Sequence, residues 1–155
     1  MGMLQTQPQA QQPQQGMAPV DAGKLQQHVN NIVKAAHAFM YSSSTHMEYT
    51  KELKANLQSN PPKVAAAKTA VSIMLLLIAE SGKDGEIKML QKAVLPAGIM
   101  IAGEILDFVA EAHHHKASEQ DAHDTISLFV SELQKSIAHI TQGAQQSAPQ
   151  ATPQP

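Results

Sequence analysis

Residues 62–81 read PKVAAAKTAVSIMLLLIAES, and this stretch decides the fold. Pro61 and Pro62 stand where a helix can begin, because proline is tolerated in a first turn but not in a helix interior. From Ile73 to Ala79 the side chains are apolar on every face of the predicted helix. A surface helix of a small monomer cannot bury such a segment. We therefore expect this helix either to lie at the centre of a bundle or to be covered by another subunit.

Helical pattern precedes this stretch. Asp21 is a suitable N-cap for a first helix, and the run from Ser42 to Thr45 is poor helix interior because hydroxyl side chains compete for backbone hydrogen bonds. A second apolar stripe then extends to Leu57. We expect either one long helix or two pieces. The apolar positions of the first segment recur every three or four residues: Leu25, Val29, Ile32, Val33, Ala36, Phe39 and Met40.

Helical pattern also follows the central stretch. The polar turn at residues 82–85 leads into a segment that begins near Glu86 and contains Pro96, where we expect a kink or a break. Gly98 and Ala102 are small enough to let another helix approach closely. The sequence thus predicts a second packing surface in this segment. The candidate residues for packing, either within the chain or between copies, are Ile73, Leu76, Leu77, Gly98 and Ala102.

The final helix has the clearest boundaries. Ser118 and Asp121 resemble a capping box with Asp in place of Glu, and Gly143 is expected to end the helix. Its apolar residues again repeat every three to four positions: Ile126, Phe129, Leu133, Ile137 and Ile140. No stretch alternates with the period of a β-strand over strand length.

These patterns predict an all-α fold, a bundle of four to five helices in a single domain over residues 21–142. Hydrophobic residues make up 43% of the 155 residues but aromatic residues only 3%, which is typical of a helical bundle. Residues 1–20 and 143–155 are rich in Gln and Pro and hold almost nothing apolar to bury. We expect both to be disordered tails.

Composition excludes several classes of function. The chain has no Cys and its formal net charge is −2, with every cation a Lys and no Arg, so specific nucleic-acid binding is not expected. No nucleophile elbow, phosphate loop or dinucleotide fingerprint is present. We therefore expect no enzyme, no catalytic residue and no cofactor.

A stripe of acidic and His residues is the main chemical feature. Glu104, Asp107, Glu111, His114 and His115 recur at helical spacing, and Glu111 with His114 forms a Glu-x-x-His pair of the kind that ligates iron in di-iron bundles. Such a site needs a second pair and further Glu residues, which the sequence does not supply. We expect no specific metal site, with Glu111, His114 and His115 as the candidate ligands if a metal binds.

Membrane insertion is a lesser alternative. Residues 70–79 and 93–103 are apolar runs that could form a helical hairpin. Each is shorter than the roughly 20 residues that a spanning helix needs, and Glu80 and Glu104 close them. Membrane contact is expected only after a conformational change.

In composition and architecture, with Ala- and Gln-rich helical segments between low-complexity ends, the chain resembles the small structural and accessory proteins of tailed-phage virions. No residue motif carries this resemblance. It implies a self-associating virion component, either a portal or tail-associated piece or an internal protein ejected with the genome. Such a protein would be a homo-oligomer in contact with other virion proteins, located in the virion and in the host cytoplasm during assembly.

Two alternatives remain open. The first is a cytoplasmic helical adaptor or regulatory module whose flexible arms bind partner proteins. The second is a metal-binding helical bundle. Oligomer size separates the virion component from the adaptor, because a particle component should form a closed ring or bind a large assembly.

Overall fold

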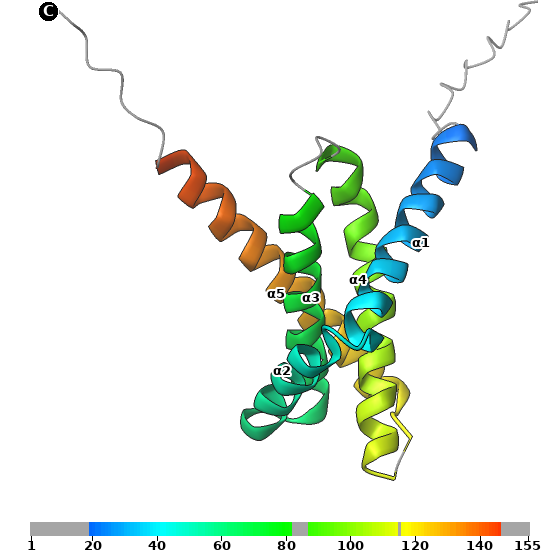
Figure 1. Cartoon of the computed structure of the whole chain (residues 1–155), viewed down its shortest axis with the longest axis vertical. Coiled ribbons are helices and arrows are strands. Elements are labelled where there is room, and N and C mark those ends of the chain that lie inside the picture. The colour runs from blue at the N-terminus through cyan, green and yellow to red at the C-terminus, as the bar shows by residue number, and fades with distance from the viewer. Residues whose placement is uncertain (1–18, 82–86, 115, 147–155) are drawn as a thin grey trace, which may run out of the picture.

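A computed structural model describes residues 19–81, 87–114 and 116–146, and in these ranges it contains five α-helices and no strand. The predicted all-α bundle is confirmed, and of the two helix counts expected it has the larger (Figure 1). The predicted disordered tails lie largely outside the described residues. The helices are α1 (Pro19–Tyr41), α2 (His46–Ser59), α3 (Pro62–Ser81), α4 (Ile87–Ala112) and α5 (Glu119–Gln146).

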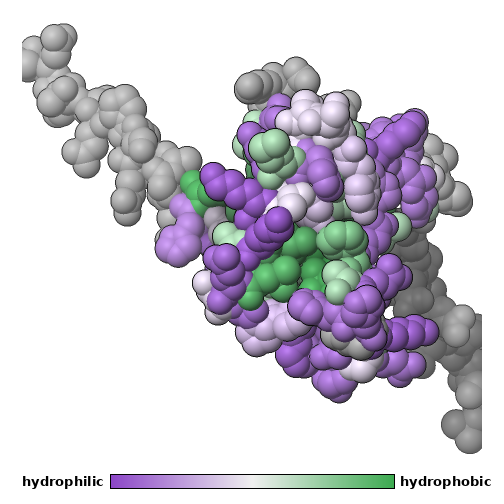
Figure 2. Space-filling view, turned by 60° about the horizontal axis from the view of Figure 1, so that its bottom comes forward, coloured by the Kyte–Doolittle hydropathy of each residue, from purple (hydrophilic) through white to green (hydrophobic). Residues whose placement is uncertain are grey.

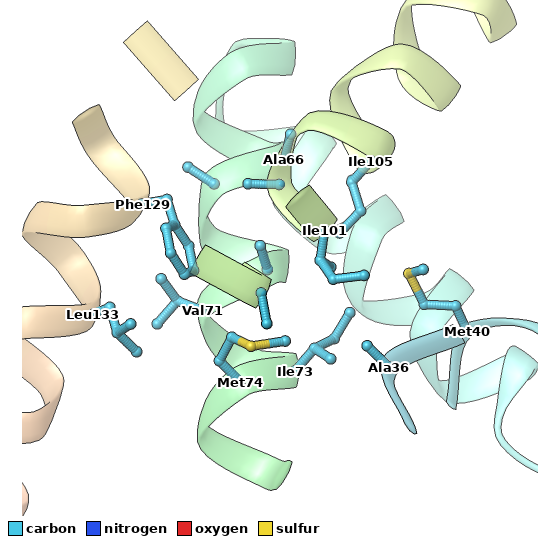
Figure 3. Close-up of a cluster of buried hydrophobic side chains, with 14 of the residues drawn as sticks. Ala36, Met40, Ala66, Val71, Ile73, Met74, Ile101, Ile105, Phe129 and Leu133 are labelled. Carbon is cyan, nitrogen blue, oxygen red and sulfur yellow. The ribbon is translucent and has the colours of Figure 1, made fainter. Parts of the chain in front are cut away.

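The apolar helix α3 lies at the centre of the bundle and contacts each of the other four helices. In Figure 1 the upper part of α1 and the C-terminal part of α5 diverge on opposite sides of the α3–α4 pair. Of the two expectations for this helix, a place at the centre of the bundle is therefore the one observed for its buried turns. Figure 3 shows Ile73 and Met74 of α3 among side chains from α1, α4 and α5.

The core is built from small and aliphatic side chains. In the first turns of α3, residues Ala65, Ala66, Ala67 and Ala70 are buried, and their small size lets the neighbouring helices come close. Larger residues fill the spaces between the helices: Met40 of α1, Ile101 and Ile105 of α4, and Phe129 and Leu133 of α5. The apolar stripe predicted for the first helix supplies four buried residues: Val29, Ile32, Ala36 and Met40.

The polar run at residues 42–45 separates α1 from α2, so the two-piece alternative is the observed one. The hydroxyl of Thr45 donates to the carbonyl of Phe39 at 2.6 Å, and Nδ1 of His46 donates to the carbonyl of Met40 at 2.6 Å. These side chains satisfy carbonyl groups that the end of α1 leaves without helical partners. The same residues that disfavour a continuous helix therefore stabilise the turn.

Two buried hydroxyl groups are paired between elements. Thr69 of α3 accepts a hydrogen bond from Asn56 of α2 at 3.0 Å, and the hydroxyl of Thr125 in α5 lies 3.4 Å from the carbonyl oxygen of Lys63. Within the described part of the chain, no buried side-chain polar atom lacks a hydrogen-bond partner. Burial of these two Thr residues therefore leaves no unpaired polar group.

Of the kink or break predicted at Pro96, the break is wrong, because α4 is continuous from Ile87 to Ala112 with Pro96 inside it. Proline removes the N–H that would bond the carbonyl of Lys92, four residues earlier. Pro96 and Lys92 are both exposed. Water can therefore hydrate the carbonyl that lost its partner, and the helix continues.

Two other predicted helix boundaries are wrong. Helix α1 begins at Pro19 and not after Asp21, since proline is pre-organised for the first helical position and an acidic residue is favourable within the first turn. Helix α5 continues through Gly143 to Gln146. A single Gly costs a helix only about 1 kcal/mol, and the next proline in the chain is Pro149.

The predicted capping box at the start of α5 is confirmed and is part of a polar contact with α3. The hydroxyl of Ser118 donates to Asp121 Oδ2 at 2.6 Å, and the backbone N–H of Asp121 bonds back to the Ser118 hydroxyl oxygen at 3.1 Å. One turn later Asp124 accepts a bond from Nζ of Lys63 at 2.6 Å. The hydrogen bond from Ser118 lowers the pKa of Asp121, and the bond from Lys63 lowers the pKa of Asp124.

Helices α4 and α5 meet at Gly98. A Cβ atom added to Gly98 would lie 2.8 Å from Cε1 of Phe129 and closer still to Cζ. Phe129 is fully buried, so its ring has no free space into which to move. The expectation that Gly98 permits close approach of a helix is confirmed, and the helix that approaches is α5 of the same chain.

We predict that Gly98→Ala lowers the free energy of unfolding by about 1–3 kcal/mol, because the added methyl group overpacks the contact with Phe129. Gly103→Ala is the matched control in the same helix, since a Cβ there meets nothing within 4 Å. The control should raise stability by about 0.5–1 kcal/mol through helix propensity. Urea unfolding of both variants measures the difference, and equal effects would contradict the close contact.

We predict that Asp124 is one cause of the loss of folding stability at low pH. Because its pKa is lowered from 3.8 in the folded chain, its contribution is present above that ordinary value and is lost as the pH falls through the lowered one. Asp124→Asn should reduce the fall in melting temperature between about pH 5 and pH 2. Thermal melts across this range provide the measurement. An unchanged acid limb would show that the bond to Lys63 contributes nothing in solution.

Candidate functional site

The acidic and His stripe is divided by the structure. Glu104 lies between helices and pairs with His37 of α1, with 2.6 Å between its Oε2 and Nε2 of His37. Asp107 and Glu111 are exposed farther along α4, and neither forms an ion pair with another described residue. Helical spacing placed these three carboxylates on one face, but only Glu104 has a partner in α1.

Two of the three candidate metal ligands line one cavity. Glu111 and His114 line an open surface cavity of about 500 Å³ together with Asp107 and Lys116, whereas His115 lies outside the described residues. In the parts of the chain that the structure describes, no three His, Asp or Glu residues are placed to hold a metal ion. Lys116 lines the same cavity as the two carboxylates.

His114 has a different structural feature. It follows the last turn of α4 with φ of 59°, and its backbone N–H bonds to the carbonyl of Glu111 at 2.9 Å. This left-handed conformation at a helix end is one that glycine adopts without the cost imposed by a Cβ atom.

The residues proposed for packing divide into two groups. Ile73, Gly98 and Ala102 are buried within the core of the single chain, and Leu77 is half-buried against it. Leu76 is 40% exposed. Of the five, it is the one with substantial surface left for contact with another molecule.

Large apolar side chains are also exposed on the upper turns of α4. Leu95 is 37% exposed and Met100 is 48% exposed, while Leu75 and Ile99 are half-buried. Helices α1 and α5 make no contact with each other and diverge at this level, so they cover these turns incompletely (Figure 1). These turns therefore leave several large apolar side chains in contact with solvent.

Both central helices also meet the length and composition of membrane spans, over Pro62–Glu80 and Lys92–Ala112. The buried core helices of soluble proteins meet the same criterion. Much of each segment faces the interior of the bundle. Length and composition alone therefore do not distinguish these two helices from membrane spans.

A second exposed surface lies at the lower end of the bundle. Helix α2 carries an open groove of about 800 Å³ whose lining includes Met47, Lys51 and Lys54, with no carboxylate among the described lining residues. This face is not predictable from the sequence. Lys residues on an exposed helix are common, and only the structure shows whether they are paired. Figure 2 shows a hydrophobic patch ringed by hydrophilic residues at this end.

Comparison with protein-family models, curated proteins and solved structures finds no match to this chain.

We predict that His114→Gly raises the free energy of unfolding by about 0.5–1 kcal/mol, because glycine relieves the left-handed strain. The same substitution removes a candidate metal ligand. Melting curves with and without added zinc measure both effects. A loss of stability, or a zinc-induced shift in the parent chain that the substitution abolishes, would contradict this interpretation and support a metal site.

Proposed function

We propose that this chain is a non-enzymatic assembly protein that associates with copies of itself through the upper turns of the α3–α4 pair. The observation that carries the proposal is the incomplete cover over these turns, where Leu76, Leu95 and Met100 are exposed. Burial of such side chains against a second copy stabilises association by roughly 25 cal/mol for each Å² of apolar surface removed from water.

The positions of the described ion pairs favour an apolar contact at the upper turns of α3 and α4, and not a polar one. The ion pairs between helices lie at the His37–Glu104 contact and where Lys63 meets Asp121 and Asp124. In the described part of the chain, no ion pair involves residues 72–80 or 93–103, and Glu104 lies just beyond the second range. A contact made mainly of Leu, Ile and Met side chains is typical of the buried centre of homo-oligomer interfaces.

The particle context of the proposal comes from composition. A tailed-phage virion component, portal or tail-associated or ejected with the genome, requires many copies of one chain to pack together. It would be located in the virion, and in the host cytoplasm during assembly. If the chain is instead monomeric, the cytoplasmic adaptor that binds partner proteins becomes the better proposal.

The test is the mass of the purified full-length chain by light scattering on a sizing column, over a range of protein concentrations and with a chelator present. A defined oligomer is expected. Mass equal to one chain at every concentration would contradict self-association. Because the chelator removes divalent ions, an oligomer seen in its presence is not held together by an adventitious metal.

We predict that Leu76→Gln weakens association by about fivefold to tenfold, because burial of the exposed part of a Leu side chain contributes about 1 kcal/mol. Ala35→Gln, on the exposed face of α1, is the matched control and should leave the association constant unchanged. Concentration-dependent light scattering measures both. Equal association constants for the two variants would exclude the upper turns as the contact surface.

A further inference from the structure

Two exposed helix faces at the lower end of the bundle carry side chains of opposite charge that form no ion pair within the described part of the chain, although Lys116 lines the same cavity as the two carboxylates. On α2, Lys51 and Lys54 form no hydrogen bond or ion pair with another described residue. On α4, Asp107 and Glu111 are equally unpaired in the described structure. Helices α2 and α4 make no contact with each other, so these charges do not meet inside one chain.

Each face also exposes a large apolar side chain beside its charges. Met47 in the α2 groove is 80% exposed, and Phe108 on α4, between the two carboxylates in sequence, is 49% exposed. Single apolar residues on a surface are ordinary. Here each apolar side chain lies beside charged residues, and the charges on the two faces have opposite sign. Two surfaces of this composition are complementary.

The spacing of the charges matches as well. Lys51 and Lys54 are three residues apart, and Asp107 and Glu111 are four apart, which places each pair about one helical turn apart, roughly 5–6 Å along its helix. Two helices lying side by side could therefore bring each ammonium group against one carboxylate. Glu104 does not take part, since His37 already occupies it.

We propose that α2 of one copy of this chain docks on α4 of a second copy, with Lys51 and Lys54 facing Asp107 and Glu111. Every copy carries both faces, so each copy can contribute α2 to one contact and α4 to another.

This inference deepens the proposed function and rests on self-association, but it names a different surface. The α2–α4 contact lies at the lower end of the bundle, whereas Leu76 lies on the upper turns of α3. Contacts at two ends would let an assembly grow beyond a dimer. Charge pairs are screened by salt, so the two contacts should also respond differently to ionic strength.

The experiment is a charge exchange on the full-length chain, followed by sedimentation or light scattering at about 0.05 M and about 0.5 M salt. The variants K51E/K54E and D107K/E111K each place like charges on both faces, and each should weaken association by about tenfold or more at low salt. Combining all four substitutions in one chain restores opposite charges with the faces exchanged. This combined variant, and a mixture of the two separate variants, should regain association.

The matched control is K24E/K34E on exposed positions of α1, which changes the net charge as much as K51E/K54E does. The association constant of this control should stay within about twofold of that of the parent chain, because the control changes only the long-range electrostatic field. Circular dichroism of each variant checks that the helices remain folded. A control that dissociates as much as K51E/K54E would overturn the inference, because net charge alone would then explain the loss.

The remaining outcomes separate the two proposals. If the parent chain forms an oligomer but neither charge variant changes its association, the α2–α4 contact is wrong and self-association stands. If K51E/K54E dissociates and the fourfold exchange does not recover, the face on α2 binds something other than α4 and the inference fails. If the parent chain is monomeric at every concentration and salt, the proposed function fails as well.

Discussion

The apolar surface of α3 must be removed from water on every side, and the other helices are arranged by that requirement. Its alanine-rich first turns let α2, α4 and α5 approach closely, while Ile73 and Met74 fill the space that remains. The close contact of Gly98 with Phe129 holds α5 against α4 and thereby closes the core. Beyond that crossing α1 and α5 diverge, so the upper turns of α3 lose cover that the chain itself does not replace.

Much of this arrangement is predictable from the sequence, because helix periodicity and capping are local properties. The polar run at residues 42–45, the prolines at 61 and 62 and the capping box at Ser118 all mark boundaries that the structure has. The sequence overestimated the effect of Pro96, since a carbonyl that loses its partner can be hydrated where it faces solvent. It also indicated that Gly98 permits close packing, but not that Phe129 occupies the space, since periodicity defines a face and not its partner.

The surfaces were less predictable, because function there depends on which side chains remain unpaired. Spacing grouped Glu104 with Asp107 and Glu111, yet His37 of α1, 67 positions away in the sequence, pairs with the first of them. Lys51 and Lys54 resembled ordinary solvated residues. Only the absence of a nearby carboxylate in the described part of the α2 groove distinguishes them. The two proposed contacts therefore have different physical origins, one in uncovered apolar area and one in unpaired charge.

The central claim is that a second copy covers the upper turns of α3 and α4, which the chain itself leaves open. Hydrogen exchange measured by mass spectrometry on the full-length chain, at low and at high protein concentration, tests it most directly. The account predicts that peptides from residues 72–80 and 93–103 exchange more slowly at high concentration, while peptides from α1 exchange equally at both. If the protein forms an oligomer at the high concentration but the α3 and α4 peptides exchange equally at both concentrations, the claim is contradicted.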